Sequence, residues 1–451
     1  MSDTSLAVIN NMIREAAHPV TMASEDYDPL IELIGDAHFV LIGEASHGTH
    51  EFYQERASIT RRLITEKGFT VVAVEADWPD AYRVNRYVRG IDDDNTPEEA
   101  LAGFKRFPVW MWRNTVVLDF VQWLRAYNAS LPSTTRQTGF YGLDLYSLLA
   151  SMEEVIRYLD KVDPEAARRA RYRYSCFEQF GEDTEVYGYE AGFVMSKSCE
   201  DEVVNQLVEL QRHTEEYSKR DGRVAEDEFF YAEQNARLAM DAEEYYRTMF
   251  IGKVSSWNLR DTHMVETLDA LVAHLDRQFG QSSTKVVLWE HNSHLGDARA
   301  TSMGREGEIN VGQLVRERHG NDNVLVGCST YTGTVTAASD WGKPHERKRV
   351  RPALEGSYEA LFHDTGIPNF LLTLHDAGSK VNRGLHGPRL ERAIGVIYLP
   401  RTERVSHYFN ARLPEQFDAV LHFDNTRALE PLDHTEIWER GEMPETYPVT
   451  V

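Results

Sequence analysis

The sequence is poor in cysteine. Its 451 residues include only three, Cys176, Cys199 and Cys328. They are far apart, odd in number and without the close pairing of a metal site, so we expect neither a disulfide framework nor a thiolate zinc site. Such cysteine usage fits a reducing cytoplasm.

Basic charge and long apolar runs are also scarce. Lys and Arg total 48 against 72 Asp and Glu, a formal net charge of -24. This balance argues against nucleic acid or an anionic membrane surface as a partner. No stretch of about 18 apolar residues occurs, and the first 20 residues lack a basic start followed by an apolar core. We expect a soluble, cytoplasmic protein, and we assign no oligomeric state.

The chain is nevertheless rich enough in apolar residues, at 42%, to bury a large interior. Its length predicts one large domain with insertions or two lobes. Short β-branched runs recur and end in polar or glycine-containing segments. They occupy 38–46, 70–77, 138–145, 285–292, 323–331, 392–400 and 419–425. Continuous apolar strands are typical of sheets covered on both faces, so we predict an α/β fold with a mainly parallel open sheet flanked by helices.

The composition and spacing of residues divide the chain into three regions. Residues 1–147 and 251–451 carry the strand pattern and form the two parts of the α/β core. Residues 148–250 are rich in Arg, Glu, Tyr and Gln at helical spacing, which predicts a helical insertion or lobe over the cleft. The glycines, prolines and basic run in 338–357 predict a long surface loop, with a mobile lid as the alternative.

The segment "VLIGEASHGTH", residues 40–50, allows three interpretations. A phosphate-binding loop would need a lysine where Thr49 stands, and Glu44 would repel phosphate. A serine nucleophile elbow would need glycines two residues before and after Ser46, and Glu44 takes the first of these places. The third interpretation, a histidine and carboxylate set at the end of a strand, is favoured.

Other predicted strands end in the same kind of residue. Acids and imidazoles follow four strands: Glu44 and His47, Glu75 and Asp77, Asp144, and Glu290, His291 and His294. The carboxyl ends of strands in open α/β sheets line one crevice, so these side chains are expected to meet there. Each also has a structural alternative, as a helix cap, a turn residue or a paired core group.

A helical segment around Arg260 and an aromatic segment around Trp110 are expected to have structural roles. In "SSWNLRDTHMVETL" the helical stripe runs through Trp257, Met264 and Leu268, and Arg260 with Asp261 is expected to form an ordinary surface pair. Trp110, in "FPVWMWRN", is expected mainly in packing, with an apolar wall for a large substrate as the alternative.

Several segments together resemble one known family. "LIGEASHGTHEFYQERASITRRLITEKGFTVVAVEADWP", "FYGLDLYSL", "WNLRDTHM" and "VLWEHNSHLGD", with the tail from residue 392, resemble the erythromycin esterase family in order from roughly residue 30 onward. The resemblance implies an α/β fold with a helical portion over the cleft and hydrolysis of a macrolide lactone or other carboxylic ester. It places the general base at His47, with Glu44, Glu75, Arg56 and His291 as its companions.

The roles that the resemblance implies agree with the side-chain chemistry at these positions. In the hypothesis, His47 takes a proton from the attacking water, Glu44 or Glu75 orients the imidazole, His291 protonates the leaving alkoxide or shares the base role, and Arg56 stabilises the oxyanion. Asp144, His294 and Trp110 are the candidate substrate-binding residues. No cofactor is expected, although two alternatives stay open: the same His and Glu residues could bind a divalent metal, or the cleft could bind a small molecule without catalysis.

Overall fold

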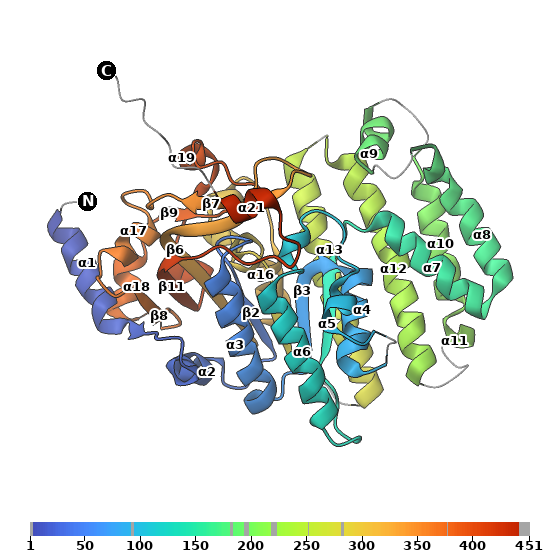
Figure 1. Cartoon of the computed structure of the whole chain (residues 1–451), viewed down its shortest axis with the longest axis horizontal. Coiled ribbons are helices and arrows are strands. Elements are labelled where there is room, and N and C mark those ends of the chain that lie inside the picture. The colour runs from blue at the N-terminus through green and yellow to red at the C-terminus, as the bar shows by residue number, and fades with distance from the viewer. Residues whose placement is uncertain are drawn as a thin grey trace.

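The computed structural model describes residues 3–91, 94–180, 184–193, 198–217, 223–250, 252–280, 284–376 and 378–441. A nine-stranded sheet runs through the middle of the molecule (Figure 1), in the order β1-β8-β11-β6-β2-β5-β3-β4, with β7 paired to β6. Its six parallel strands are β2 (Phe39–Ile42), β3 (Val71–Asp77), β4 (Gly139–Asp144), β5 (Val286–Trp289), β6 (Asn323–Ala338) and β11 (Ala419–Thr426). The predicted α/β fold with a mainly parallel sheet is confirmed.

Three strands of the sheet run antiparallel to their neighbours: β1 (His18–Pro19), β7 (His345–Val350) and β8 (Asn369–Thr373). The prediction of a long loop over 338–357 is therefore wrong in its centre. Residues 345–350 pair with the last residues of β6, and His345, Lys348 and Val350 are buried. Their basic composition hid the strand, because charged residues are common where a strand pairs on one side only.

The predicted strand over 392–400 is also wrong for most of its length. The small sheet of β9 (Arg389–Arg392) and β10 (Tyr408–Ala411) includes only its first residue. The residues that follow cross the segment after β2 instead: Ile394 N–H donates to the Ala45 carbonyl at 2.8 Å, and His47 N–H donates to the Ile394 carbonyl at 3.2 Å. The apolar run thus covers the predicted active-site segment.

The central strands alternate between two cores. Val40, Val72 and Val287 face the cluster formed with α3 (His50–Lys67) and α6 (Thr115–Ser130). Leu41, Ala73 and Leu288 face the cluster formed with α13 (Lys253–Phe279) and α16 (Val311–His319). The result is three layers, helix on sheet on helix, as continuous apolar strands require.

A helical lobe stands beside the β4 end of the sheet, at the right in Figure 1. It consists of α7 (Leu148–Val162), α8 (Pro164–Tyr174), η3 (Ser175–Phe180), α9 (Thr184–Phe193), α10 (Glu200–Arg212), α11 (Thr214–Tyr217) and α12 (Arg223–Thr248). The helical character predicted for 148–250 is confirmed within the described residues. The domain limits at 147/148 and 250/251 stay predictions.

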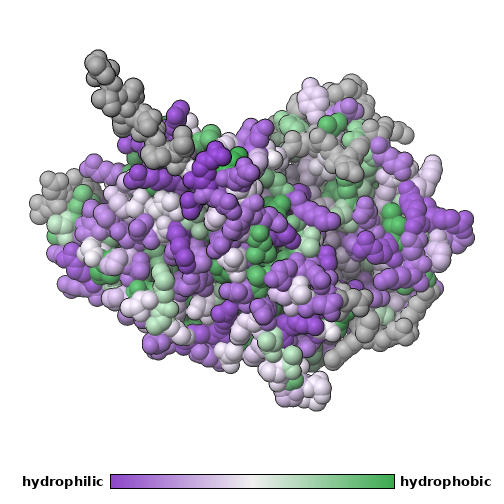
Figure 2. All heavy atoms as spheres, viewed as in Figure 1, coloured by the Kyte–Doolittle hydropathy of each residue, from purple (hydrophilic) through white to green (hydrophobic). Residues whose placement is uncertain are grey.

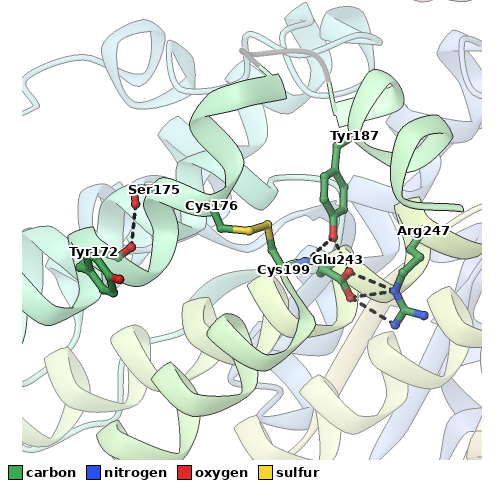
Figure 3. The surroundings of a disulfide bond; sticks show 7 residues. All are labelled: Tyr172, Ser175, Cys176, Tyr187, Cys199, Glu243 and Arg247. Atoms are coloured by element: carbon green, nitrogen blue, oxygen red, sulfur yellow. Dashed lines mark hydrogen bonds and ion pairs between the residues drawn. A yellow bond between two sulfur atoms is a disulfide. The ribbon is translucent and has the colours of Figure 1, made fainter. Parts of the chain in front are cut away.

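The lobe contains a disulfide between Cys176 and Cys199, with their Cα atoms 5.9 Å apart (Figure 3). The expectation of no disulfide was wrong. The odd count arises because Cys328, buried in β6, is a free thiol. The bond joins η3 to the start of α10. Beside it the Tyr187 hydroxyl accepts from Cys199 N–H at 3.0 Å and donates to Glu243, so the disulfide, α9 and α12 form one connected group.

The remaining elements surround this framework: α1 (Asp3–Ala16), η1 (Ser24–Tyr27), α2 (Asp28–Ile34), α4 (Trp78–Arg89), α5 (Pro97–Leu101), η2 (Val109–Met111), α14 (Asn292–Leu295), η4 (Ala298–Ala300), α15 (Ser302–Arg305), α17 (Tyr358–His363), α18 (Lys380–Leu385), α19 (Glu403–Ser406), α20 (Leu413–Gln416) and α21 (Glu436–Arg440). Polar residues cover most of the face in Figure 2, and apolar residues gather in a band near its middle. Among the described residues, every helix is too short or too polar to cross a bilayer.

Candidate active site

The predicted site residues meet because four strands that carry them are neighbours in the order β2-β5-β3-β4. Glu44 and His47 follow β2, His291 follows β5, Glu75 lies near the end of β3, and Asp144 ends β4. All five are buried. Parallel strands bring their carboxyl ends to one edge of the sheet, and this edge holds the site.

The glycines of the segment after β2 allow close packing of backbones. A Cβ at Gly48 would lie 1.9 Å from the Thr336 carbonyl oxygen, and one at Gly43 would lie 2.3 Å from the Asn292 side-chain oxygen. Ser46 is buried, and its hydroxyl contacts that of Thr49. The segment is thus a tightly packed turn that fixes His47, as the favoured interpretation requires.

His47 is held in one tautomer. Its Nδ1 lies 2.9 Å from Glu44 Oε1, which also accepts from the Tyr53 hydroxyl at 3.2 Å. A proton on Nδ1 satisfies this contact and leaves the Nε2 lone pair free. Nε2 lies 3.9 Å from Glu75 Oε1. His47 therefore presents a proton acceptor beside a carboxylate.

His291 has the opposite tautomer. Ser293 N–H donates to its Nδ1 at 3.2 Å, and the Ser293 hydroxyl lies 2.8 Å from the same atom. The proton must then be on Nε2, which is buried. Burial, followed by the neighbouring His47 imidazole, holds the pKa of His291 well below its usual range. The ring is neutral, and its centroid lies 4.7 Å from that of His47.

Glu75 connects the two histidines to the rest of the cluster. Its Oε2 accepts from His291 N–H at 2.9 Å, and its Oε1 accepts from Arg260 Nη2 at 2.7 Å. Burial alone would raise the pKa of this carboxyl, but the imidazoles of His294 and His47 and the Arg260 guanidinium hold it well below its usual range. The site therefore contains a carboxylate that stays ionised.

Arg260 and Asp261 belong to this cluster, so their interpretation as a surface pair was wrong. Arg260 donates to both oxygens of Asp144, at 2.9 and 2.7 Å, and its Nη1 lies 3.0 Å from His294 Nε2. Asp261 lies 2.9 Å from His294 Nδ1, and Trp257 stacks on that imidazole with centroids 4.4 Å apart. Sequence spacing could have found the pair, because Asp261 is four residues after Trp257 and three before Met264, on the same buried stripe of α13.

Two predicted residues lie outside the facing imidazoles. Arg56 is buried below the segment after β2, with Nη2 3.5 Å from Glu44 Oε2 and its guanidinium over the rings of Tyr53 and Trp289. This position suits support of the Glu44 charge. Trp110 is buried against Phe107, with centroids 5.3 Å apart, and no contact joins it to His47 or His291 among the described residues. Asp144 and His294 are brought into the cluster through Arg260.

Glu290 is a buried acid of a different kind. Both of its carboxyl oxygens lack a hydrogen-bond partner among the described residues. Burial, and then the charges of Glu75 and Asp261, raise its pKa well above the usual range. The carboxyl is therefore held in its neutral form beside an ionised one.

The described residues contain no preformed metal site. Across the described ranges no three or more His, Cys, Asp or Glu side chains are placed to share one metal ion. His47 Nδ1 and His294 Nδ1 already face carboxylates, and His291 Nδ1 faces Ser293. The ring atoms left for a ligand are the Nε2 atoms of His47 and His291.

A cavity of about 1410 Å³ adjoins the cluster. It lies between α4, α7, α12 and the segment around Arg106, at the boundary of the core and the helical lobe. The histidines do not line it. Its inner wall is formed by Asp77, Arg106 and Tyr146, and the Tyr146 ring lies between two guanidiniums, 4.7 Å from that of Arg106 and 4.8 Å from that of Arg260. Tyr146 thus separates the cavity from Arg260 of the cluster.

The fold and the buried cluster define an α/β protein whose strand ends assemble imidazoles and carboxylates in the manner of an enzyme site. The sequence pattern of the erythromycin esterase family matches residues 64–426. The chain belongs to the erythromycin esterase family.

Known relatives are distant but extend over most of the chain. Erythromycin esterase type II of Escherichia coli is 23% identical over 365 residues, 76% of this chain and 82% of the relative. A putative hydrolase, YbfO of Bacillus subtilis strain 168, is 23% identical over 426 residues, 88% of this chain and 86% of the relative. These relatives support assignment as a hydrolase.

Solved structures share the fold. The crystal structure of a succinoglycan biosynthesis protein superposes with a TM-score of 0.74 at 22% identity, covering 95% of this chain and 100% of that one. An erythromycin esterase mutant in its open conformation gives a TM-score of 0.67 at 17% identity, over 92% of this chain and 97% of that one.

Proposed function

We propose that this protein is a carboxylic ester hydrolase in which His47 activates the attacking water. The proposal depends on one observation: of the two neighbouring imidazoles, one presents a hydrogen-bond acceptor and the other a hydrogen-bond donor. His47 offers the Nε2 lone pair, and His291 offers Nε2–H. A proton acceptor and a hydrogen-bond donor on two rings whose centroids lie 4.7 Å apart are what ester hydrolysis needs.

The steps balance without any further reactant. His47 Nε2 takes a proton from water while the water oxygen bonds to the ester carbonyl carbon. The carbonyl oxygen gains the negative charge and accepts a hydrogen bond from His291 Nε2–H. Collapse breaks the bond to the leaving alkoxide, which receives the proton from the His47 imidazolium. Glu75, ionised nearby, stabilises that imidazolium, and Glu44 maintains the tautomer.

This scheme changes the role suggested for His291 by the sequence. A neutral imidazole gives up its Nε2 proton only at high pH, so it is a poor acid toward an alkoxide. Its depressed pKa instead suits a hydrogen-bond donor to the oxyanion. Protonated His47, in place of His291, protonates the leaving alkoxide.

The volume of the cavity supports a proposal for the substrate class. A space of about 1410 Å³ exceeds the roughly 300–1,000 Å³ typical of small-ligand sites, so a large ester or a macrolide lactone suits it. The non-reacting part of such a molecule would occupy the cavity, and its ester would have to pass Tyr146 to reach the histidines, which do not line the cavity. Two relatives named as erythromycin esterases support testing a macrolide first.

The test is a hydrolysis panel of erythromycin and para-nitrophenyl esters, with and without chelator. His47→Asn is expected to lower kcat by about 10² to 10⁴ with an unchanged melting temperature. His375→Asn, at a largely exposed histidine, is the matched control. Chelator is expected to leave the rate unchanged. A folded His47→Asn protein with full activity would remove the assignment, and activity lost to chelator and restored by one divalent metal would replace the mechanism.

A further inference from the structure

One residue of the cavity wall comes from the opposite part of the chain. The other lining residues lie between Asp77 and Met249, whereas Trp341 lies in the turn between β6 and β7. Its side chain reaches the segment that precedes Trp110, where its ring centroid lies 4.9 Å from that of Phe107, at 60°. Trp341 and Phe107 therefore close one side of the cavity from two different elements.

The turn holds Trp341 in place. Trp341 N–H donates to the Asp340 carboxylate at 2.8 Å, and Lys343 N–H donates to the Asp340 carbonyl at 3.2 Å. Gly342 has a φ of 69°, which side-chain-bearing residues rarely adopt. These contacts fix the backbone from which the indole extends, at the surface of the protein.

Phe107 is anchored from behind. Its ring contacts buried Trp110, and Trp110 contacts His345 of β7, with centroids 5.5 Å apart. The row Trp341, Phe107, Trp110, His345 begins and ends on the same hairpin. Trp341 and Phe107 line the cavity, and Trp110 and His345 pack behind Phe107.

Trp341 itself is incompletely packed, with 47% of its surface exposed. Several charged groups of the cavity wall are already paired, as in Arg106 with Asp77 at 2.8 Å and Arg83 with Asp94 at 2.8 Å. The Tyr82 and Tyr231 rings stack 4.0 Å apart on the α4 and α12 side. Aromatic faces with neutralised charges favour a bulky apolar group over a small or strongly charged one.

We propose that Trp341 and Phe107 form an aromatic clamp that selects esters carrying a bulky apolar group. This inference rests on the proposed hydrolase function for its kinetic test. The clamp binds the part of the substrate remote from the ester, so it acts on the choice of substrate and leaves the chemistry at His47 unchanged.

The kinetic test compares para-nitrophenyl naphthoate, which is bulky, with para-nitrophenyl acetate, which is small. Trp341→Ala is expected to lower kcat/KM for the naphthoate about 10-fold and to change the acetate less than about 2-fold. Trp341→Phe is expected to recover most of the difference, because it restores a ring. Tyr172→Ala, at an aromatic side chain 83% exposed on α8, is the matched control and is expected to change neither.

A binding measurement separates the clamp from the hydrolase assignment. The amide N-(para-nitrophenyl)naphthamide, which resists hydrolysis, is titrated by calorimetry into the wild type and the Trp341→Ala variant. About 10-fold weaker binding to the variant supports the clamp even if no ester is cleaved. Equal binding, or equal loss of kcat/KM for both esters, overturns it. If the wild type binds the amide about 10-fold more tightly than the variant and cleaves no ester, the hydrolase proposal fails and the clamp stands.

Discussion

The imidazole rings of His47 and His291 lie with centroids 4.7 Å apart and their planes at 45°. They are neighbours because β2 and β5 pair in parallel, with Ile42 opposite Trp289, so the residues that follow the two strands leave the sheet side by side. Each ring is fixed by its own chain neighbours, His47 by Glu44 and His291 by Ser293. Both partners can therefore be changed one at a time.

Glu44→Gln is expected to lower kcat by about 10² to 10⁴, because an amide does not hold the proton on His47 Nδ1. KM and the melting temperature are expected to change little, since the amide fills the same space. Steady-state kinetics on a para-nitrophenyl ester measures the effect. Glu66→Gln, at a half-exposed acid on the same helix as Arg56, serves as the control. Full activity of Glu44→Gln would contradict the tautomer assignment.

Arg260→Met is expected to destabilise the fold by about 3 to 5 kcal/mol, because it leaves two buried carboxylates, Glu75 and Asp144, without their shared cation. The measurement is urea unfolding. Arg299→Met removes the exposed member of another Arg–Asp pair and is expected to cost less than about 1 kcal/mol. Equal costs for the two variants would mean that Arg260 is not the central cation of the cluster.

Glu290→Gln has a pH-dependent prediction. In the unfolded chain Glu290 has the ordinary glutamate pKa of about 4.3 and loses its proton above that pH. In the folded chain the pKa is raised, so the carboxyl keeps its proton to higher pH. Stability that is complete below the unfolded pKa is lost as pH rises toward the folded pKa. Glutamine does not ionise in either state, so its stability does not fall with rising pH in this way. The unfolding free energy of the variant, relative to that of the wild type, is therefore expected to be higher at about pH 8 than at about pH 4. A difference in unfolding free energy that is independent of pH would count against this account.

Reduction of the Cys176–Cys199 bond is expected to cost about 3 kcal/mol, because a disulfide that closes a loop of this length restricts the unfolded chain. Thermal unfolding with and without dithiothreitol measures it. The Cys176→Ser variant should reproduce the reduced wild type and no longer respond to dithiothreitol. Cys328→Ser, which removes the free thiol, should respond as the wild type does. No shift on reduction of the wild type would contradict the prediction.

The sequence predicted what depends on strand ends. Glu44, Glu75 and His291 follow continuous apolar runs or lie near the end of one, and the carboxyl edge of a parallel sheet brings such residues together because their strands are neighbours. Interactions decided by helix orientation were missed. The spacing of Asp261 from Trp257 and Met264 places it on the buried stripe of α13, but the sequence does not show which charged partners that stripe meets. β7 and the disulfide were missed for a similar reason, because both depend on which distant segment lies alongside.

Under the proposed mechanism, the opposite tautomers of the two imidazoles give the site a direction. A planar ester held at the Nε2 atoms of the two rings has one side turned to the base and its carbonyl oxygen turned to the donor. The two sides of the carbonyl plane are then not equivalent, and only one of them is open to addition. Esters whose mirror-image forms differ next to the carbonyl should react at unequal speeds, so kinetic resolution of a racemic ester would report on the orientation of the two rings.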